Sequence, residues 1–571
     1  MPNLKILIFS LLAISSISSF SQDQDRPPDS SAPELQSRPS PTPSNPQPPQ
    51  SFDQVLDRVV EREHFFMAQL RQLHPLVETY IQDLKNDSDG PVPVKDHYFL
   101  GRVDMSNGPQ DMSFMGQPKL KERLISKFTN LYSMKFLPLG FAQMVVMDGN
   151  FQRKSYNFTF VRREFLGEIR CLVIDVQPKE KEKGSAGRFI GRIWVEDENF
   201  NIVRFNGTYN AKERDNFYLH FDSWRLNMRP GIWLPAYIYS EESDLKYRGS
   251  QKLHYKSQTR LWGYDLHHLE RNEEFTQIVV DSPQSVNDKS DAIQDATPVE
   301  SERRWQREAE DNAVDRLLNI GLLAPLGDVD KVLQTVVNNL IVTNSLEIQP
   351  DVRTRVLLTS PLESFTIGHT IVISRGLLDV LPDEASLAMV MAHELSHIAL
   401  DHRLDTKLAF NDRMFFPDQN TFERLDFARP FNDEDAADKK ALELLSKSPY
   451  KDKLGSAGLF LKALQLRAPV LKSLIRPHLG NSLANGQATR MSTLINAAPN
   501  LEVRRTDQIA ALPLGGRIKL DPWSDRVELV KTKAVALVFP TEKMPFEVTP
   551  FFPYLTRMPL NDKVAASAPT Q

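Results

Sequence analysis

One pentad, His393-Glu394-Leu395-Ser396-His397, constrains this chain more than any other feature of its sequence. It lies in a run from Asp383 to Leu400 whose apolar residues recur at helical spacing, and Asp383 can cap that helix. Histidines four positions apart on a helix share one face, about 40° apart around its axis. That face can hold one Zn²⁺ through two imidazoles, with the intervening carboxylate beside the metal-bound water. The alternative is a pair of core histidines that are satisfied by backbone carbonyls.

A catalytic zinc usually takes three protein ligands, so a third ligand is expected further along the chain. A third histidine is excluded, because Leu400 and Arg403 stand where the arrangement HExxHxxGxxH needs glycine and histidine. His402 is one residue out of place. The other common solution is a glutamate on a later helix. Glu434 is the candidate, and Glu423 is the second choice because no acidic residue follows it four positions on.

The segment around Glu434 is expected to form a second helix, capped by Asn432 and running to about Ser446. Glu434 and Asp438 then lie on one face of this helix, as residues i and i+4. In this arrangement Glu434 binds the metal, while Asp438 accepts a ring N–H from a ligand histidine and fixes its tautomer. The alternative is that acidic residues in a first turn only complement the helix dipole.

This combination resembles the HtpX-like and CaaX-prenyl-protease-like gluzincin metallopeptidases, whose pattern is HExxH followed by ExxAD on a second helix. The matching residues are His393, Glu394, His397, Glu434 and Asp438. The apolar strand and turn at residues 371–378 also look like the family, and the resemblance covers roughly residues 310–500. It implies an α+β fold in which a mainly helical zincin domain carries a small edge sheet.

The chain departs from the family in two places. The family often has an Asn-Ala-Phe-like edge strand and a pair of glycines, where this chain reads Ser-Phe-Thr-Ile-Gly-His at residues 364–369. The family also tends to carry His-Pro and a nearby arginine after the third ligand. Here Pro477-His478 and the distant Arg490 stand in altered order and spacing. His478 and Arg490 are candidates for stabilising a transition state, the alternative being that they lie on a solvated helix.

The site implies a specific chemistry. Zinc bound by His393, His397 and Glu434 would lower the pKa of its water to about 7. Glu394 would take the water proton as general base and return it to the leaving amine. An extended peptide could lie along an edge strand expected around Phe365–Ser374. These expectations describe a zinc endopeptidase with one zinc ion per chain and a protein or peptide substrate.

The N-terminal residues predict export. Lys5 precedes an apolar stretch that ends at Phe20, and small residues stand before Gln22, so residues 1–21 fit a signal peptide, with an uncleaved anchor as the alternative. No later segment has 18 consecutive apolar residues. We therefore expect a soluble exported protein, in the periplasm or cell envelope if the cell is Gram-negative and otherwise secreted.

Composition divides the rest of the chain into parts. Residues 22–50 are rich in proline, serine and glutamine, which predicts a disordered linker. An amphipathic helix and a β-rich domain are expected at 51–280, with the β-rich pattern from about Phe99 to Leu269. An acidic linker at 281–302 then leads to the metallopeptidase domain at 303–500. A C-terminal extension follows at 501–571, and its end is expected to be disordered.

The β-rich domain contains one clear hairpin, across Asp197-Glu198-Asn199. Its sequence, GRIWVEDENFNIVRFNG, resembles the curved sheet of carrier domains that sort outer-membrane lipoproteins. A lipid or client ligand is therefore one prediction, and a packed domain without a ligand is the other. Cys171 lies in an apolar strand pattern and is expected to be a buried structural thiol. The net charge of −5 gives no indication of nucleic-acid binding.

Two further functions stay open at this point. One is an envelope binding or chaperone-like protein, in which the β-rich domain holds a client and the metal site is vestigial or structural. The other is a hydrolase of non-peptide amides. Zinc content measured together with casein hydrolysis separates the first from a peptidase, and substrate profiling separates the second.

Overall fold

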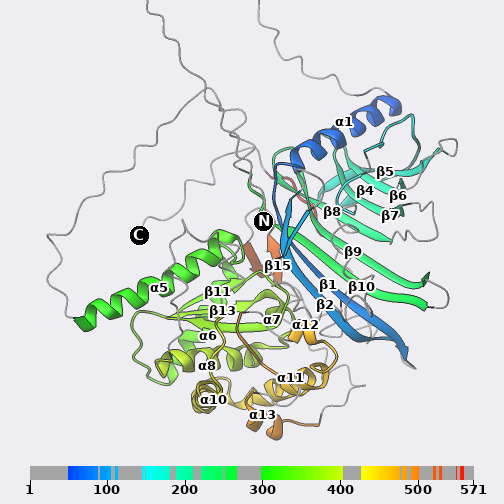
Figure 1. Ribbon diagram of the computed structural model, residues 1–571. Coiled ribbons are helices and arrows are strands. Elements are labelled where there is room, and N and C mark those ends of the chain that lie inside the picture. Colours follow the sequence, from blue (N-terminus) through cyan, green and yellow to red (C-terminus); the bar gives the residue numbers. More distant parts are fainter. Residues whose placement is uncertain are drawn as a thin grey trace, which may run out of the picture. The chain divides into compact units, whose positions relative to one another are not determined.

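The computed structural model describes residues 49, 51–87, 90–104, 110–113, 144–147, 149–179, 188–209, 220–247, 251–266, 298–402, 426–475, 479–484, 490–500, 518–521, 526–529, 548 and 553–558. The expected signal peptide, nearly all of the linker to residue 50, and the candidates Glu423 and His478 lie outside these residues. The fold class is α+β, as the sequence predicted. A large antiparallel sheet occupies the N-terminal part, and a mainly helical C-terminal part carries a small sheet (Figure 1).

The large sheet has ten strands in the order β3-β2-β1-β10-β9-β8-β7-β6-β5-β4. The strands are β1 Leu76–Asp87, β2 Gly90–Asp104, β3 Gln110–Ser113, β4 Tyr156–Leu166, β5 Ile169–Pro178, β6 Phe189–Glu196, β7 Ile202–Tyr209, β8 Phe221–Arg229, β9 Ile232–Tyr247 and β10 Gln251–Trp262. The sheet begins at Leu76 and not near Phe99, which corrects the expected start. No alternation of apolar and polar residues marks β1 in the sequence, because this strand buries the polar Glu78, Thr79 and Gln82 beside its apolar residues.

Helix α1 (Phe52–Leu70) covers one face of this sheet. Ser51 caps the helix by accepting a 3.3 Å hydrogen bond from the backbone N–H of Gln54. The apolar face of α1 packs on inward-facing residues of β5 to β9, which alternate with residues that face the other side. The hairpin expected across residues 197–199 is present, between β6 and β7.

The small sheet has the order β11-β13-β12-β14, with β11 and β13 parallel and the other pairs antiparallel. Its strands are β11 Arg353–Leu357, β12 Glu363–Ile367, β13 Thr370–Ser374 and β14 Asn481–Ser482. The expected edge strand around Phe365–Ser374 is therefore not an edge. Strand β13 lies between β11 and β12, and β14 pairs with β12 at Glu363 and Ser364. The sequence did not reveal β14, because it has two residues and lies more than 100 positions further on.

The helices of this part are α5 Pro298–Ile320, α6 Asp328–Thr343, α7 Arg375–Val380, α8 Glu384–Ala399, α10 Phe431–Ser446, the 3₁₀ turn η3 Lys451–Lys453, α11 Leu454–Arg467, α12 Lys472–Ile475 and α13 Ser492–Ala497. A separate hairpin joins β15 (Ile518–Asp521) and β16 (Arg526–Leu529). Within the described residues, no helix is both long enough and apolar enough to span a membrane.

Helices α8 and α10 pack against each other and position the site. Asp383 caps α8, accepting a 2.8 Å hydrogen bond from the backbone N–H of Ser386. Helix α10 begins at Phe431, because Pro430 and not the expected Asn432 occupies the cap position. Pro430 is extended, and its φ of −60° is compatible with a helix that starts at the next residue. Ala437 and Ala441 are fully buried on α10, and these small side chains let the two helices approach closely.

The large sheet and the helical part share one apolar cluster, to which the sheet contributes Leu76, Tyr80, Leu100 and Trp262. Polar contacts line the same junction. The Ser360 hydroxyl donates to the Glu78 carboxylate at 2.8 Å, and the backbone N–H groups of Ser473 and Leu474 donate to Asp96 at 2.9 and 2.7 Å. Ser360 precedes β12 and Leu474 precedes β14, so the sheet contacts the chain just ahead of both strands beside the site.

Candidate active site

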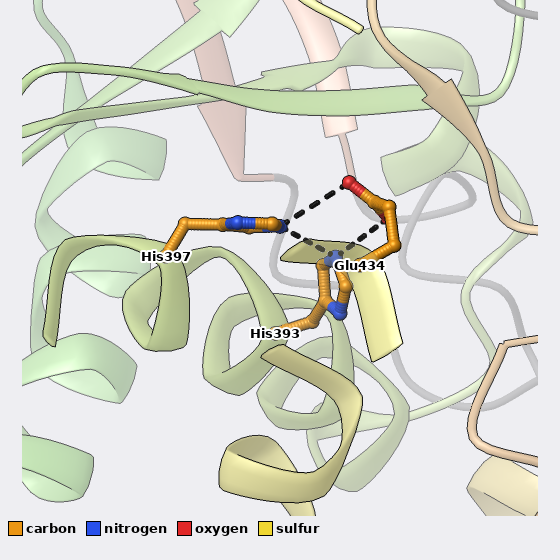
Figure 2. A group of neighbouring side chains, drawn as sticks. All are labelled: His393, His397 and Glu434. Atoms are coloured by element: carbon orange, nitrogen blue, oxygen red, sulfur yellow. Dashed lines mark hydrogen bonds and ion pairs between the residues drawn. The ribbon is translucent and has the colours of Figure 1, made fainter. Parts of the chain in front are cut away.

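Two helices bring His393, His397 and Glu434 together (Figure 2). The Nε2 atoms of the histidines lie 3.1 Å apart. His393 Nε2 lies 3.3 Å from Glu434 Oε2, and His397 Nε2 lies 3.4 Å from Glu434 Oε1. Both histidines are at most 1 % exposed. The structure thus places two imidazole nitrogens and both oxygens of one carboxylate, from residues that the sequence singled out, around one point.

The donor set fits a zinc ion. Ligands bound tetrahedrally at about 2.0–2.1 Å stand about 3.3–3.4 Å from one another. The separations found here are of this size: 3.1 Å between the two nitrogens, and 3.3 and 3.4 Å from each nitrogen to one of the two Glu434 oxygens. Two imidazoles and a carboxylate are also a ligand set that zinc accepts with an open fourth position. Glu434 Oε2 is buried beside Arg490 and His393, at 2.8 and 3.3 Å, but within the described residues neither contact has the geometry of a hydrogen bond. This oxygen can therefore still offer a lone pair to a metal ion.

Neighbouring side chains orient both histidines. Asp438 Oδ1 lies 2.8 Å from His393 Nδ1, and His402 Nδ1 lies 2.9 Å from His397 Nδ1. A carboxylate can only accept, so the proton of neutral His393 resides on Nδ1 and the Nε2 lone pair faces the other two donor atoms. The contact with His402 allows the same tautomer for His397.

Glu394 projects from the same helix turn toward strand β12. The Ser364 hydroxyl donates to Glu394 Oε1 at 2.6 Å, and the Thr366 hydroxyl donates to Oε2 at 2.7 Å. Glu394 is 2 % exposed. Both oxygens of this buried carboxylate therefore have a donor, and the carboxylate is fixed in place by residues i and i+2 of one strand, which face the same side.

Arg490 lies at the site, immediately before α13, and not on a solvated helix as the sequence analysis allowed. One guanidinium nitrogen lies 2.8 Å from His393 Nε2, and the other forms a 2.8 Å ion pair with Glu434 Oε2. The Asn481 amide of β14 also donates to Glu434, and Arg429 donates to the carbonyl of Thr366 at 3.0 Å. The outer side of β12 is thus in contact with β14 and Arg429.

Burial and hydrogen bonding shift the ionisation of the three donors. Burial acts to raise the pKa of Glu434, but the adjacent His393 and His397 and the charge of Arg490 outweigh it, and the net shift is downward. Burial lowers the pKa of His397. Burial and the charge of Arg490 also act to lower the pKa of His393, but its contacts with Asp438 and Glu434 outweigh them, and the net shift is upward. A carboxylate that stays ionised and an imidazole that stays neutral are the forms that bind a metal ion.

Residues 329–415 match the model of peptidase family M48. The match covers α6 to α8 and includes His393, Glu394 and His397. It supports a metallopeptidase of this family, which implies metal-dependent proteolysis with protein as the substrate and zinc as the metal of the family. The matched segment ends before Glu434.

No curated protein matches the chain. Among solved structures, a DUF1329 family protein from Desulfovibrio piger is 11% identical, covering 37% of this chain and 91% of that chain with a TM-score of 0.18. The MucA/MucB complex of Pseudomonas aeruginosa is 10% identical, covering 38% of this chain and 95% of that chain with a TM-score of 0.13. At these TM-scores neither likeness carries an argument about this chain.

Several residues that contact the M48-like motif were not predicted from the sequence to belong to the site. Ser364 and Thr366 were noted only because residues 364–369 differ from the family's edge strand. His402 was noted only because it stands one residue from the position of a third histidine ligand. Asn481 and Arg429 gave no sequence signal at all. Each comes from a strand or loop whose path to the site is decided by tertiary packing.

Proposed function

We propose that this chain is a zinc-dependent endopeptidase that hydrolyses peptide bonds of exported or envelope proteins, with Glu394 as general base. The observation that carries the proposal is the convergence of His393 Nε2, His397 Nε2 and a Glu434 carboxylate at 3.1 to 3.4 Å, beside a buried second glutamate. Zinc held there would acidify a bound water and polarise the scissile carbonyl. An exported location is part of the proposal and follows from the N-terminal sequence.

Glu394 is suited to move a proton. Each of its oxygens has a second lone pair beside the one that accepts from Ser364 or Thr366, so one oxygen can still accept the proton of the attacking water. The same oxygen then returns the proton to the nitrogen of the departing amine. Because two hydroxyls fix the carboxylate, it needs no reorganisation between the two transfers.

For this function Arg490 has to give up its contact with His393 Nε2. His393 Nε2 has a single lone pair, which cannot accept from Arg490 and bind a metal ion at once. Moving off His393 leaves the guanidinium paired with Glu434 and close to the reacting groups. There it is a candidate for stabilising negative charge on the carbonyl oxygen. His478, the other transition-state candidate, stays a prediction.

The test compares the wild-type protein with Glu394→Gln. We expect about one zinc per chain in both, and hydrolysis of casein by the wild type only, because glutamine keeps the shape of the side chain but cannot take the proton. Glu443→Gln, an exposed change on α10, is the matched control and should keep full activity. Full casein hydrolysis by Glu394→Gln would overturn the mechanism. Zinc without turnover in the wild type would favour the chaperone-like alternative.

A further inference from the structure

The face of the large sheet opposite α1 holds a second apolar cluster, separate from the candidate metal site. Side chains of β4 to β9 build it, among them Trp194, Trp224, Trp233 and Tyr237. One member comes from elsewhere in the chain: Leu555, more than 300 residues further on, is fully buried in this cluster. The C-terminal segment 553–558, which has neither helical nor strand structure, thus lies on the sheet as an extended strip.

The sheet contacts the backbone of this segment at two points. The backbone N–H of Glu168 donates to the carbonyl of Leu555 at 2.8 Å, and the backbone N–H of Met558 donates to Asn227 Oδ1 at 2.9 Å. Gly167 makes the first contact possible. It has a φ of +68°, and a Cβ there would meet the Leu555 carbonyl oxygen at 2.5 Å. The β4–β5 turn is therefore shaped to admit another backbone.

The β6–β7 turn supplies a charged anchor next to the apolar one. Arg557 lies 2.8 Å from the carboxylate of Glu196 and 3.1 Å from that of Glu198, with Asp197 at 3.8 Å. Glu196 is fully buried, and its carboxylate also accepts backbone N–H groups of its own turn. Those neutral donors leave its negative charge uncompensated, so the turn favours a cation on the segment that lies there.

The segment has one side on the sheet and the other side in solvent. Pro553 and Leu555 are buried, while Tyr554 between them is 57 % exposed, which is the alternation of an extended chain with one side on a surface. The indole N–H of Trp233 in this cluster has no hydrogen-bond partner within the described part of the chain. The segment is thus attached by two buried apolar residues, one basic side chain and two hydrogen bonds to its backbone, as a short peptide ligand would be.

We infer that this face of the sheet is a binding site for extended peptides that carry a branched aliphatic residue followed two positions later by a basic residue. Residues 553–558 are its resident occupant. The inference goes beyond the proposed peptidase function and uses none of the residues of the metal site. A resident segment on the same chain competes at a high effective concentration. An external peptide therefore occupies the site only when its affinity outweighs that advantage or when the segment is released.

The test uses a fluorescent peptide of residues 551–560, FFPYLTRMPL, and the full chain carrying Glu394→Gln so that the peptide stays intact. A peptide with Leu555→Ala and Arg557→Glu is the matched control. Placing the same two changes in the protein should release its own segment. We expect that protein to bind the unchanged peptide at least about tenfold more tightly than the protein with the native segment does, and to ignore the control peptide.

A second measurement needs no change in the segment. Excess unchanged peptide should accelerate hydrogen exchange at residues 556–558 of the chain with the native segment, in a saturable way, while the control peptide should not. Unaltered exchange, together with no binding by a folded released variant, would show that the segment is a permanent part of the fold and would overturn the inference. If the released variant loses its circular dichroism, the exchange measurement decides alone. Dimers that exchange their C-terminal segments would make a second copy the occupant and would overturn it as well.

Discussion

A 2.8 Å hydrogen bond joins His393 Nδ1 on α8 to Asp438 Oδ1 on α10. The other oxygen of Asp438 accepts a 2.8 Å hydrogen bond from the backbone N–H of Met491, just before α13. One carboxylate therefore ties together the two helices of the site and the segment that carries Arg490. Because this carboxylate accepts the ring proton, it turns the Nε2 lone pair of His393 toward the other donor atoms.

Asp438→Ala should weaken zinc binding by about 10–100-fold, because the ring of His393 loses the partner that sets its tautomer and orientation. Competition with a chromophoric chelator measures the affinity. Asp435→Ala on the same helix is the matched control, since Asp435 is half-exposed and pairs with Lys439, away from the site. Equal affinities in the two variants would mean that Asp438 does not orient the ligand.

Glu434→Ala should reduce the zinc content well below one per chain and abolish casein hydrolysis. The change removes one of three donors and leaves two imidazoles alone. Metal analysis after dialysis measures the stoichiometry, with Glu443→Ala, an exposed glutamate on the same helix, as the control. Undiminished zinc in Glu434→Ala would identify the third ligand as another residue.

Ser364→Ala and Thr366→Val should each lower kcat by about 10–100-fold, with KM and zinc content unchanged. Each variant removes a hydroxyl that donates to the buried carboxylate of Glu394, and a hydrogen bond to a charged group contributes about 1.5–3 kcal/mol. Thr370→Val on the neighbouring strand is the control. The Thr370 hydroxyl is also buried but has no hydrogen-bond partner in the described part of the chain. A kcat that falls equally in the control would point to a general packing effect.

Glu63→Ala should destabilise the protein by about 3–5 kcal/mol, because it leaves the buried guanidinium of Arg225 without its counter-charge. The pair is bidentate, at 2.7 and 2.8 Å, with both side chains at most 2 % exposed, and it attaches α1 to β8. Urea unfolding measures the difference. Glu61→Ala, an exposed change on the same helix, should stay within about 0.5 kcal/mol of the wild type. Two variants of equal stability would show that the pair contributes nothing net.

Cys171 should resist thiol reagents at pH 8 in the folded protein and react fully in denaturant. Burial, with the negative charges of Glu196 and Asp197 adding to it, raises the pKa of its thiol to about 12, so almost no reactive thiolate is present. As the one cysteine of the chain, it gives a single colorimetric signal with Ellman's reagent. Rapid labelling under native conditions would contradict the buried position.

Local patterns of the sequence predicted the parts of the site that lie on helices, apart from the cap of α10. The cap at Asp383, the end of α10 at Ser446 and the shared face of Glu434 and Asp438 all follow from periodicity and capping within one segment. The structure brings the two helices together so that these side chains converge. The roles assigned to them in metal binding and catalysis stay predictions until zinc and activity are measured.

The remaining contacts depend on how distant segments meet, which one sequence does not specify. Ser364 and Thr366 face Glu394 only because β12 lies in one register beside α8. Arg490 reaches the site only because the chain returns past β14 after α12. Strand β1 gave no apolar alternation because its polar residues are satisfied by partners in other strands and in the helical part.

The apolar cluster that the large sheet shares with the helical part makes the two halves of the protein depend on each other. Separating the two halves by recombination would expose Leu76, Tyr80, Leu100 and Trp262 to water and would leave the carboxylate of Glu78 without Ser360. Neither half is therefore expected to keep its stability when it is produced without the other. Changes on one side of the shared cluster should be accompanied by compensating changes on the other.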